Sequence, residues 1–164
     1  KQVYEIVLAA QESALEQCIS GKNFQEPHEA ALKVLTQGLF DLKILNSNQH
    51  GSVEDAIQSE AYKPYYMHRT SHWLGMDVHD VGSYREPNDP LLGWRILRAG
   101  MALTIEPGLY FRPSPEVPEM FWNIGIRIED DVVIRSSHYE ILSRDVPVKV
   151  SEIEYWMANG SMQI

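Results

Sequence analysis

The chain has 164 residues, of which 44% are hydrophobic and 23% are charged. This composition is ordinary for one globular domain with a hydrophobic core, and it argues against disorder. Acidic residues outnumber basic residues by 23 to 14, and the resulting net charge of −9 disfavours nucleic acid as a partner.

Cys18 is the single cysteine, so no intrachain disulfide is possible. Its place in an apolar helical pattern indicates a buried thiol in a reducing compartment, and we therefore expect a cytoplasmic protein. No apolar stretch approaches the length of a membrane span, so we expect no membrane partner. Lys1 opens directly into an amphipathic pattern without an initiator methionine, and we expect the chain to be part of a longer protein.

The first 64 residues predict three helices. Apolar residues recur at helical spacing over residues 2–20 and again over 27–42, where Pro27 suits a first helical turn. Residues 46–51 are expected to form a loop. Ser52-Val53-Glu54-Asp55 resembles a capping box with Asp in place of Glu, and it predicts a short helix that ends before Pro64.

The remainder predicts strands, because its runs are short, rich in β-branched and aromatic residues, and broken by Gly and Pro. Residues 101–106 and 124–129 each alternate between two faces, and we expect 132–134 to be the hairpin partner of 124–129. Ser151 and Glu154 suggest a capping box that starts a closing helix. Helices followed by an antiparallel sheet define an α+β class.

Three histidines, His68, His72 and His79, lie within twelve residues of one another. A lone histidine is usually a hydrogen-bonded structural residue, but clustering favours a functional site. His72 and His79 would point to opposite faces of a continuous strand, so we expect the backbone to turn at Gly75 and bring both toward one site.

Two glutamates stand at predicted strand ends, Glu106 after Ile105 and Glu129 after Ile128. A rigid sheet can hold carboxylates with the precision that metal binding needs. Arg127 is two residues from Glu129 and shares its face, where a guanidinium could orient a carboxylate or a substrate carbonyl. Solvated strand ends are the simpler explanation for acidic residues, and we accept it for Asp130 and Asp131.

Three ordered segments then resemble the downstream signatures of Xaa-Pro aminopeptidase (aminopeptidase P): residues 71–80 (SHWLGMDVHD), 104–110 (TIEPGLY) and 125–130 (GIRIED). Residues 116–119 (EVPE) also resemble a loop of that family. Prolidase and creatinase share the scaffold, methionine aminopeptidase more distantly, and Ser71-His72-Trp73 favours aminopeptidase P. The resemblance implies the C-terminal half of a pita-bread fold, with helices on one face of an antiparallel sheet.

The resemblance also implies a centre of two divalent metal ions, for which hard oxygen ligands and one imidazole suit manganese or a similar ion. His72 and Glu106 would be ligands of one metal, and Glu129 would bridge both. Glu106 would also be catalytic, as the group that takes a proton from the attacking water. His79 would be catalytic and would contact the substrate by stabilising charge on the former carbonyl oxygen.

His68 and Arg127 would line the substrate side of that centre. Arg69 departs from the family pattern, because a glycine is often expected there in bacterial relatives, and it changes the shape of the substrate-side wall. The implied substrates are peptides with proline at the second position.

The family also requires two aspartate ligands from an upstream hairpin, and an additional N-terminal domain. No aspartate pair in this chain has that context, so residues 1–164 are expected to be the C-terminal part of a catalytic domain and inactive alone. The resemblance further implies a domain of two halves related by a pseudo-twofold axis. We therefore expect two copies of this chain to be able to pair as a homodimer.

Two other functions remain open. A prolidase-type dipeptidase shares the scaffold, but the Ser71-His72-Trp73 and residue 116–119 features argue against it. A pita-bread module that only binds proteins has no need to keep His72, Glu106, Glu129 and His79.

Overall fold

The computed structural model describes residues 1–86 and 93–160. Its helices are α1 (Gln2–Leu15), α2 (Glu26–Asp41), α3 (Ser47–His50), α4 (Val53–Gln58) and α5 (Val150–Asn159), with a 3₁₀ turn at Glu119–Phe121. Its strands are β1 (Ala102–Ile105), β2 (Gly108–Phe111), β3 (Ile124–Arg127), β4 (Asp130–Ile134) and β5 (Tyr139–Ile141). No helix in these ranges is both long and apolar enough to cross a membrane.

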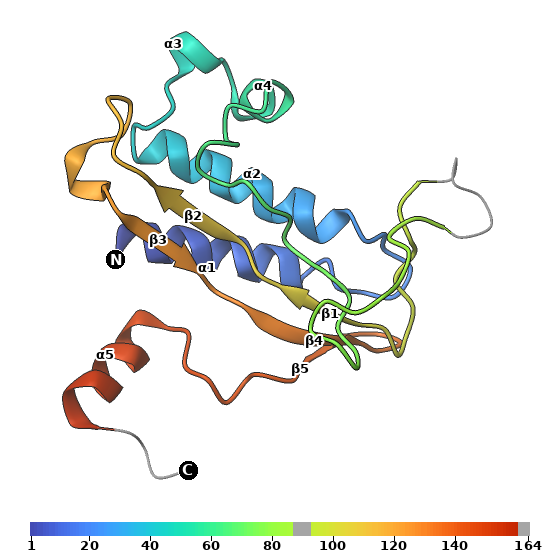
Figure 1. The fold of residues 1–164 in the computed structure, drawn as a ribbon. Coiled ribbons are helices and arrows are strands. Elements are labelled where there is room, and N and C mark those ends of the chain that lie inside the picture. Colours follow the sequence, from blue (N-terminus) through green and yellow to red (C-terminus); the bar gives the residue numbers. More distant parts are fainter. Residues whose placement is uncertain (87–92, 161–164) are drawn as a thin grey trace.

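The strands form one long, interrupted hairpin with an added edge strand (Figure 1). β1 pairs antiparallel with β4, and β2 pairs antiparallel with β3. The last pair of one ladder is Ile105 with Asp130 and the first pair of the other is Gly108 with Arg127, so both ladders keep the same register. Pro107 has no N–H to donate, which breaks the regular ladder at this point.

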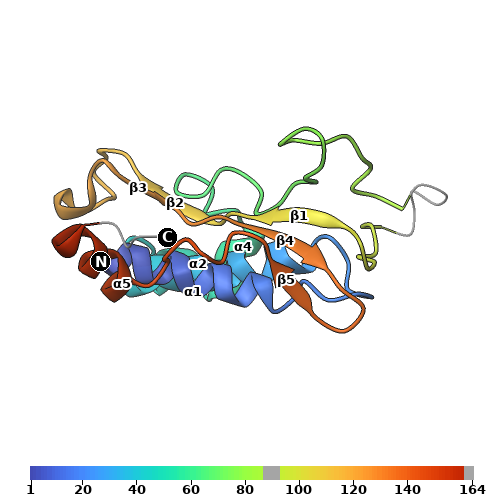
Figure 2. The same ribbon diagram turned by 90° about the horizontal axis from the view of Figure 1, so that it is seen from below.

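Helices α1 and α2 cover one face of this hairpin, as Figure 2 shows, and the loop that follows Gly75 lies on the other side. Their buried side chains form one core with the inward side chains of the strands. Its members include Val7, Ala10, Ala14, Leu35, Leu39, Leu103, Ile105, Leu109, Phe111 and Val132. The arrangement confirms the predicted α+β class with helices on one face of an antiparallel sheet.

An irregular segment before β1, which includes Thr70 and His72, pairs with the edge of β1 that faces away from β4. The N–H of Glu106 donates to the carbonyl of Thr70 at 2.8 Å, and the N–H of Thr104 donates to the carbonyl of His72 at 3.0 Å. The side chain of Thr70 points the other way, into the core, where its hydroxyl lies 2.8 Å from Nδ1 of His28 and 2.6 Å from the hydroxyl of Tyr66. The segment that carries His72 is therefore held from both sides.

Three predictions about helices were wrong. The first helix ends at Leu15 instead of residue 20, because the following amides, such as that of Cys18, bond three residues back in tight turns. Residues 46–51 contain α3, whose first turn is capped by Asn46. The closing helix begins after Lys149 without a side-chain cap, so Ser151 and Glu154 form no capping box. The capping box of Ser52 and Asp55 is confirmed.

The predicted hairpin of residues 124–129 with 132–134 was also wrong. β3 pairs with β2, a strand that the sequence patterns did not predict, and β4 pairs with β1 and β5. Asp130 and Asp131 lie in β4 and form no turn. Asp130 is also not a solvated strand-end residue as expected: it is buried, with 3% of its surface exposed, between the buried side chains of Ile128 and Val132.

Candidate metal centre

Two carboxylates face each other at the interruption of the hairpin. Because the ladders on either side share one register, Glu106 lies across from Glu129. Glu106 is buried, with 8% of its surface exposed, whereas Glu129 is open to solvent. Like charges directly opposite each other destabilise a sheet, so this pair calls for a cation or a proton between its members.

His72 completes the group from the neighbouring segment. Its Nδ1 lies 3.0 Å from the carbonyl oxygen of Trp73, which can only accept, so Nδ1 carries the proton. Nε2 then faces Glu106 Oε1 at 3.2 Å with its lone pair. Two acceptors at this distance require a cation or an added proton, and a histidine held by a carbonyl in this way is the usual arrangement for a metal ligand.

The three side chains meet at one place. One donor atom from each of His72, Glu106 and Glu129 lies within 4.8 Å of the other two. Although Glu129 is exposed overall, partial desolvation of its carboxylate raises its pKa, and the charges of Glu106 and Asp131 act in the same direction. Two carboxylates and one imidazole suit a divalent cation, whose charge would offset this repulsion.

A chain of hydrogen bonds leads from Glu106 toward His68. Glu106 Oε2 accepts from Arg127 Nη1 at 3.2 Å, and Arg127 Nε donates to the hydroxyl of Tyr110 at 2.7 Å. That hydroxyl lies 2.8 Å from Nε2 of His68, whose Nδ1 lies 2.8 Å from the carbonyl oxygen of Arg69. Because the carbonyl fixes the proton on Nδ1, Tyr110 donates to His68 and accepts from Arg127.

Tyr110 was missed as a site residue in the sequence, although a signal was present. It follows Glu106 and Gly108 at the period of two that places residues on one face of a strand. A Cβ at Gly108 would lie 2.7 Å from the Tyr110 hydroxyl, and one at Gly125 would lie 3.2 Å from Tyr110 Cδ1. The two glycines therefore leave room for the tyrosine ring on the face that carries Glu106.

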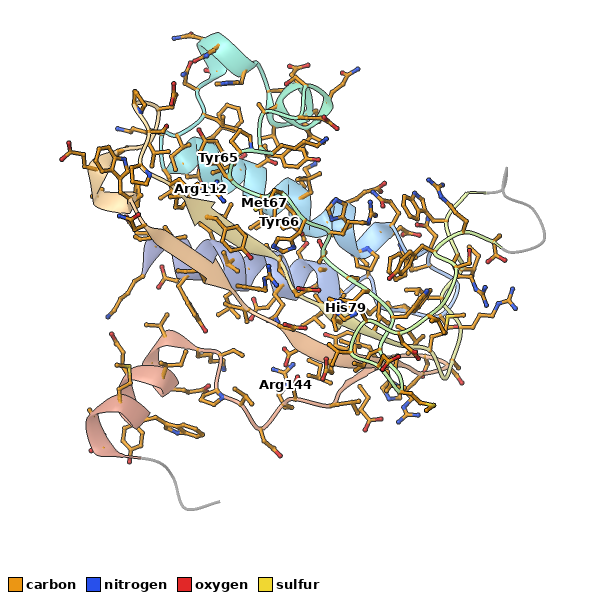
Figure 3. The ribbon with its side chains drawn as sticks, in the orientation of Figure 1. Tyr65, Tyr66, Met67, His79, Arg112 and Arg144 are labelled. Atoms are coloured by element: carbon orange, nitrogen blue, oxygen red, sulfur yellow. The ribbon has the colours of Figure 1, made fainter. Side chains whose placement is uncertain are left out.

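His79 lies beside the three converging side chains. Its ring is exposed and meets the ring of His72 edge-on, with centroids 4.2 Å apart. Figure 3 places it near the β1 part of the sheet. The chain turns between the two histidines at Gly75, where a Cβ would lie 1.7 Å from Asp80 Oδ2. The structure thus brings His72 and His79 together through the expected turn.

The fold and the site together match those of one family of metallopeptidases. The model of metallopeptidase family M24 matches residues 1–136, and the chain belongs to this family. It is 42% identical to the Xaa-Pro aminopeptidase of Escherichia coli over 99% of its own length, and 40% identical to that of Haemophilus influenzae over 96%. It spans only 35% and 34% of these two relatives, about a third of their length.

Solved structures agree. The aminopeptidase PepP of Pseudomonas aeruginosa superimposes with a TM-score of 0.89 at 46% identity, over 96% of this chain and 34% of that one. Aminopeptidase P of E. coli with the inhibitor Pro-Leu gives 0.85 at 43% identity, with the same coverage. The chain therefore has the fold of the matching part of aminopeptidase P, as the sequence motifs predicted.

Proposed function

We propose that this chain is the C-terminal part of the catalytic domain of a metal-dependent Xaa-Pro aminopeptidase, here called the parent protein. The convergence of His72, Glu106 and Glu129 carries the proposal, because it occurs in a chain at least 40% identical to enzymes named Xaa-Pro aminopeptidase. The two aspartate ligands and the N-terminal domain would come from the segment that precedes Lys1 in the parent. We also infer a cytoplasmic location, because the single cysteine, Cys18, is a buried free thiol.

The residues that would hold the metals are His72 and Glu106 for one ion and Glu129 for both. Two divalent cations, manganese or similar, lower the pKa of a water and polarise a peptide carbonyl when bound. Glu106 takes the proton from the attacking water and passes it to the proline nitrogen as the C–N bond breaks. His79 stabilises the charge that develops on the carbonyl oxygen.

The hydrogen-bond chain from Glu106 to His68 shapes the leaving side of the site, that is, the side that would hold the departing peptide with its N-terminal proline. Arg127 holds the second oxygen of Glu106, which leaves Oε1 for the centre shared with His72. His68 presents a neutral, half-buried ring, and burial lowers its pKa. A ring without charge can lie against a proline side chain, which suits substrates with proline at the second position.

The test is hydrolysis of Ala-Pro-Ala by the parent protein with and without Mn²⁺. We expect turnover only with a divalent metal, and Glu129→Ala should lower kcat by at least about 10³-fold, since one bridging carboxylate serves both ions. Glu12→Ala, which removes an exposed carboxylate from α1, is the matched control and should retain full activity. Turnover by Glu129→Ala at the wild-type rate would reject the two-metal centre.

The same assay separates the alternatives. A prolidase-type enzyme would cleave the dipeptide Ala-Pro faster than the tripeptide. A binding module would cleave neither, whatever metal is added.

A further inference from the structure

Two arginines stack on one tryptophan next to His68. The Cζ atom of Arg69 lies 4.5 Å from the centroid of the Trp94 ring, and the Cζ atom of Arg85 lies 3.8 Å from it. The backbones of Arg85 and Trp94 form an antiparallel bridge, so the ring has a fixed position. Gln25 accepts a hydrogen bond from Arg69 Nη2. We call Arg69, Arg85 and Trp94 the arginine clamp.

The clamp concentrates positive charge in an acidic protein. Neither guanidinium lies within 4.0 Å of a carboxylate belonging to residues 1–86 or 93–160. Burial lowers the pKa of Arg69, and the neighbouring charge of Arg85 acts in the same direction. Arg69 uses one of its five N–H donors on Gln25, a neutral amide, so most of its donors remain for an anion.

The clamp adjoins the leaving side of the candidate site. Arg69 follows His68 directly, and its carbonyl ends the hydrogen-bond chain that begins at Glu106. A peptide cleaved at the metal centre directs its proline toward His68 under the proposed function. The next residue of an extended substrate would then lie about 3.5 Å further along, beyond His68 and on the side of its chain neighbour Arg69.

We propose that Arg69, whose guanidinium lies over the Trp94 ring, binds a carboxylate on the third residue of the substrate. A guanidinium offers two parallel N–H donors that match a carboxylate, and stacking on indole fixes its plane in advance. The carboxylate is either the C-terminus of a tripeptide or an Asp or Glu side chain. Arg69 is therefore a specificity residue, and this inference rests on the proposed function.

The experiment compares kcat/KM of the parent protein with Mn²⁺ for Ala-Pro-Ala, Ala-Pro-Ala-NH₂ and Ala-Pro-Asp-NH₂. We expect roughly a tenfold preference for the free acid over the amide, which is the usual size for a partly exposed charged hydrogen bond. The preference should fall with rising salt. A preference for Ala-Pro-Asp-NH₂ over Ala-Pro-Ala-NH₂ would identify the side chain as the carboxylate that is read.

Arg69→Gln should bring the ratio of kcat/KM for the free acid to kcat/KM for the amide close to one. It should do so by raising KM for the acid, while kcat/KM for the amide stays within about twofold of wild type. Arg69→Lys should retain part of the ratio, because it keeps the charge and loses the planar fork. Arg144→Gln is the control, because it removes the same charge from the exposed segment between β5 and α5 (Figure 3). It should leave kcat/KM unchanged for both the acid and the amide.

An unchanged ratio in Arg69→Gln, or equal losses on acid and amide, would overturn the clamp. Calorimetric binding of the leaving peptide Pro-Ala against Pro-Ala-NH₂ supplies the same ratio without turnover. A parent that cleaves none of the peptides would refute the aminopeptidase assignment, and the binding ratio would still decide whether Arg69 binds a carboxylate.

Discussion

At the scale of single residues, the centre depends on side chains whose protonation is fixed by backbone carbonyls. His72 and His68 each direct Nδ1 to a carbonyl oxygen, of Trp73 and Arg69 respectively. Both rings therefore present the lone pair of Nε2 to the site. The lone pair of His72 faces the carboxylate of Glu106, whereas that of His68 accepts a hydrogen bond from the hydroxyl of Tyr110.

Tyr110→Phe tests the chain between Glu106 and His68. The hydroxyl accepts from Arg127 and donates to His68, so its loss frees both partners without changing the ring that fills the space. We expect kcat of the parent protein to fall about tenfold, the usual cost of one hydrogen bond to a charged group. Metal content measured by atomic absorption should stay at the wild-type value. Loss of metal from Tyr110→Phe would show that the tyrosine supports the ligands instead of the substrate side.

His28 gives a prediction about stability and pH. Burial lowers its pKa to about 4, and the nearby charges of Arg69 and His68 act in the same direction. The unfolded chain takes up this proton near pH 6.5 and the folded chain only near pH 4, so stability falls as the pH drops through that window. The loss should approach roughly 3 kcal/mol at its lower end.

Thermal unfolding of the parent protein from pH 4 to 7.5 measures this effect. His28→Gln cannot be protonated, so the wild type should lose more stability than the variant between pH 6.5 and 4. Parallel curves for the two proteins would mean that His28 takes up its proton equally in both states.

At the scale of elements, the long hairpin determines where the carboxylates lie. Gly108→Ala tests this, because its Cβ would meet Ile126 O at 2.8 Å, and a strand backbone cannot yield as a side chain does. We expect β2 and β3 to move apart beside Glu106. The parent protein should lose at least about tenfold in kcat, and its free energy of unfolding should fall by about 1–3 kcal/mol. Gly125→Ala is the matched substitution on the opposite strand, where the contact of 3.2 Å is to the movable Tyr110 ring. Equal losses in both variants would contradict this account.

The sequence predicted the elements better than their pairing. Helical periodicity identified α1 and α2, a capping box identified α4, and alternation identified β1 and β3, because these signals depend on neighbours along the chain. The pairing of β2 with β3 depends on a register carried across Pro107, which no local pattern encodes. The spacing of Tyr110 from Glu106 shows only that the two residues share a face; the role of Tyr110 depends on contacts with Arg127 and His68, which lie elsewhere in the chain.

At the scale of the whole molecule, the sheet has an edge at β3 that is unpaired among the described residues. Within the ranges described, β3 pairs only with β2, and its other side has no strand beside it. Ile124 and Ile126 on this strand are only partly buried, and such an edge is prone to pair with another chain. In the parent protein, the other half of the catalytic domain would cover it.

Residues 1–164 expressed alone should cleave no Xaa-Pro peptide, because the two upstream aspartate ligands are missing. Because the edge of β3 is open, the chain should also associate, with a twofold dimer as the expected form. Sedimentation at tens of micromolar measures the association, and Ile126→Lys at the open edge should reduce it. A stable monomer without dye-accessible apolar surface would show that this half covers itself. Measurable cleavage by the pure chain would contradict the need for upstream aspartates.

The shared register of the two ladders also restricts which length changes evolution can accept. The connection from Arg112 to Asn123 lies outside both ladders, so insertions there leave Glu106 opposite Glu129. A single residue inserted between Glu106 and Gly108 would shift one ladder against the other and turn one carboxylate to the helical face. Homologous chains should thus differ freely in the length of the outer loop, while the spacing from each glutamate to its flanking strands stays invariant.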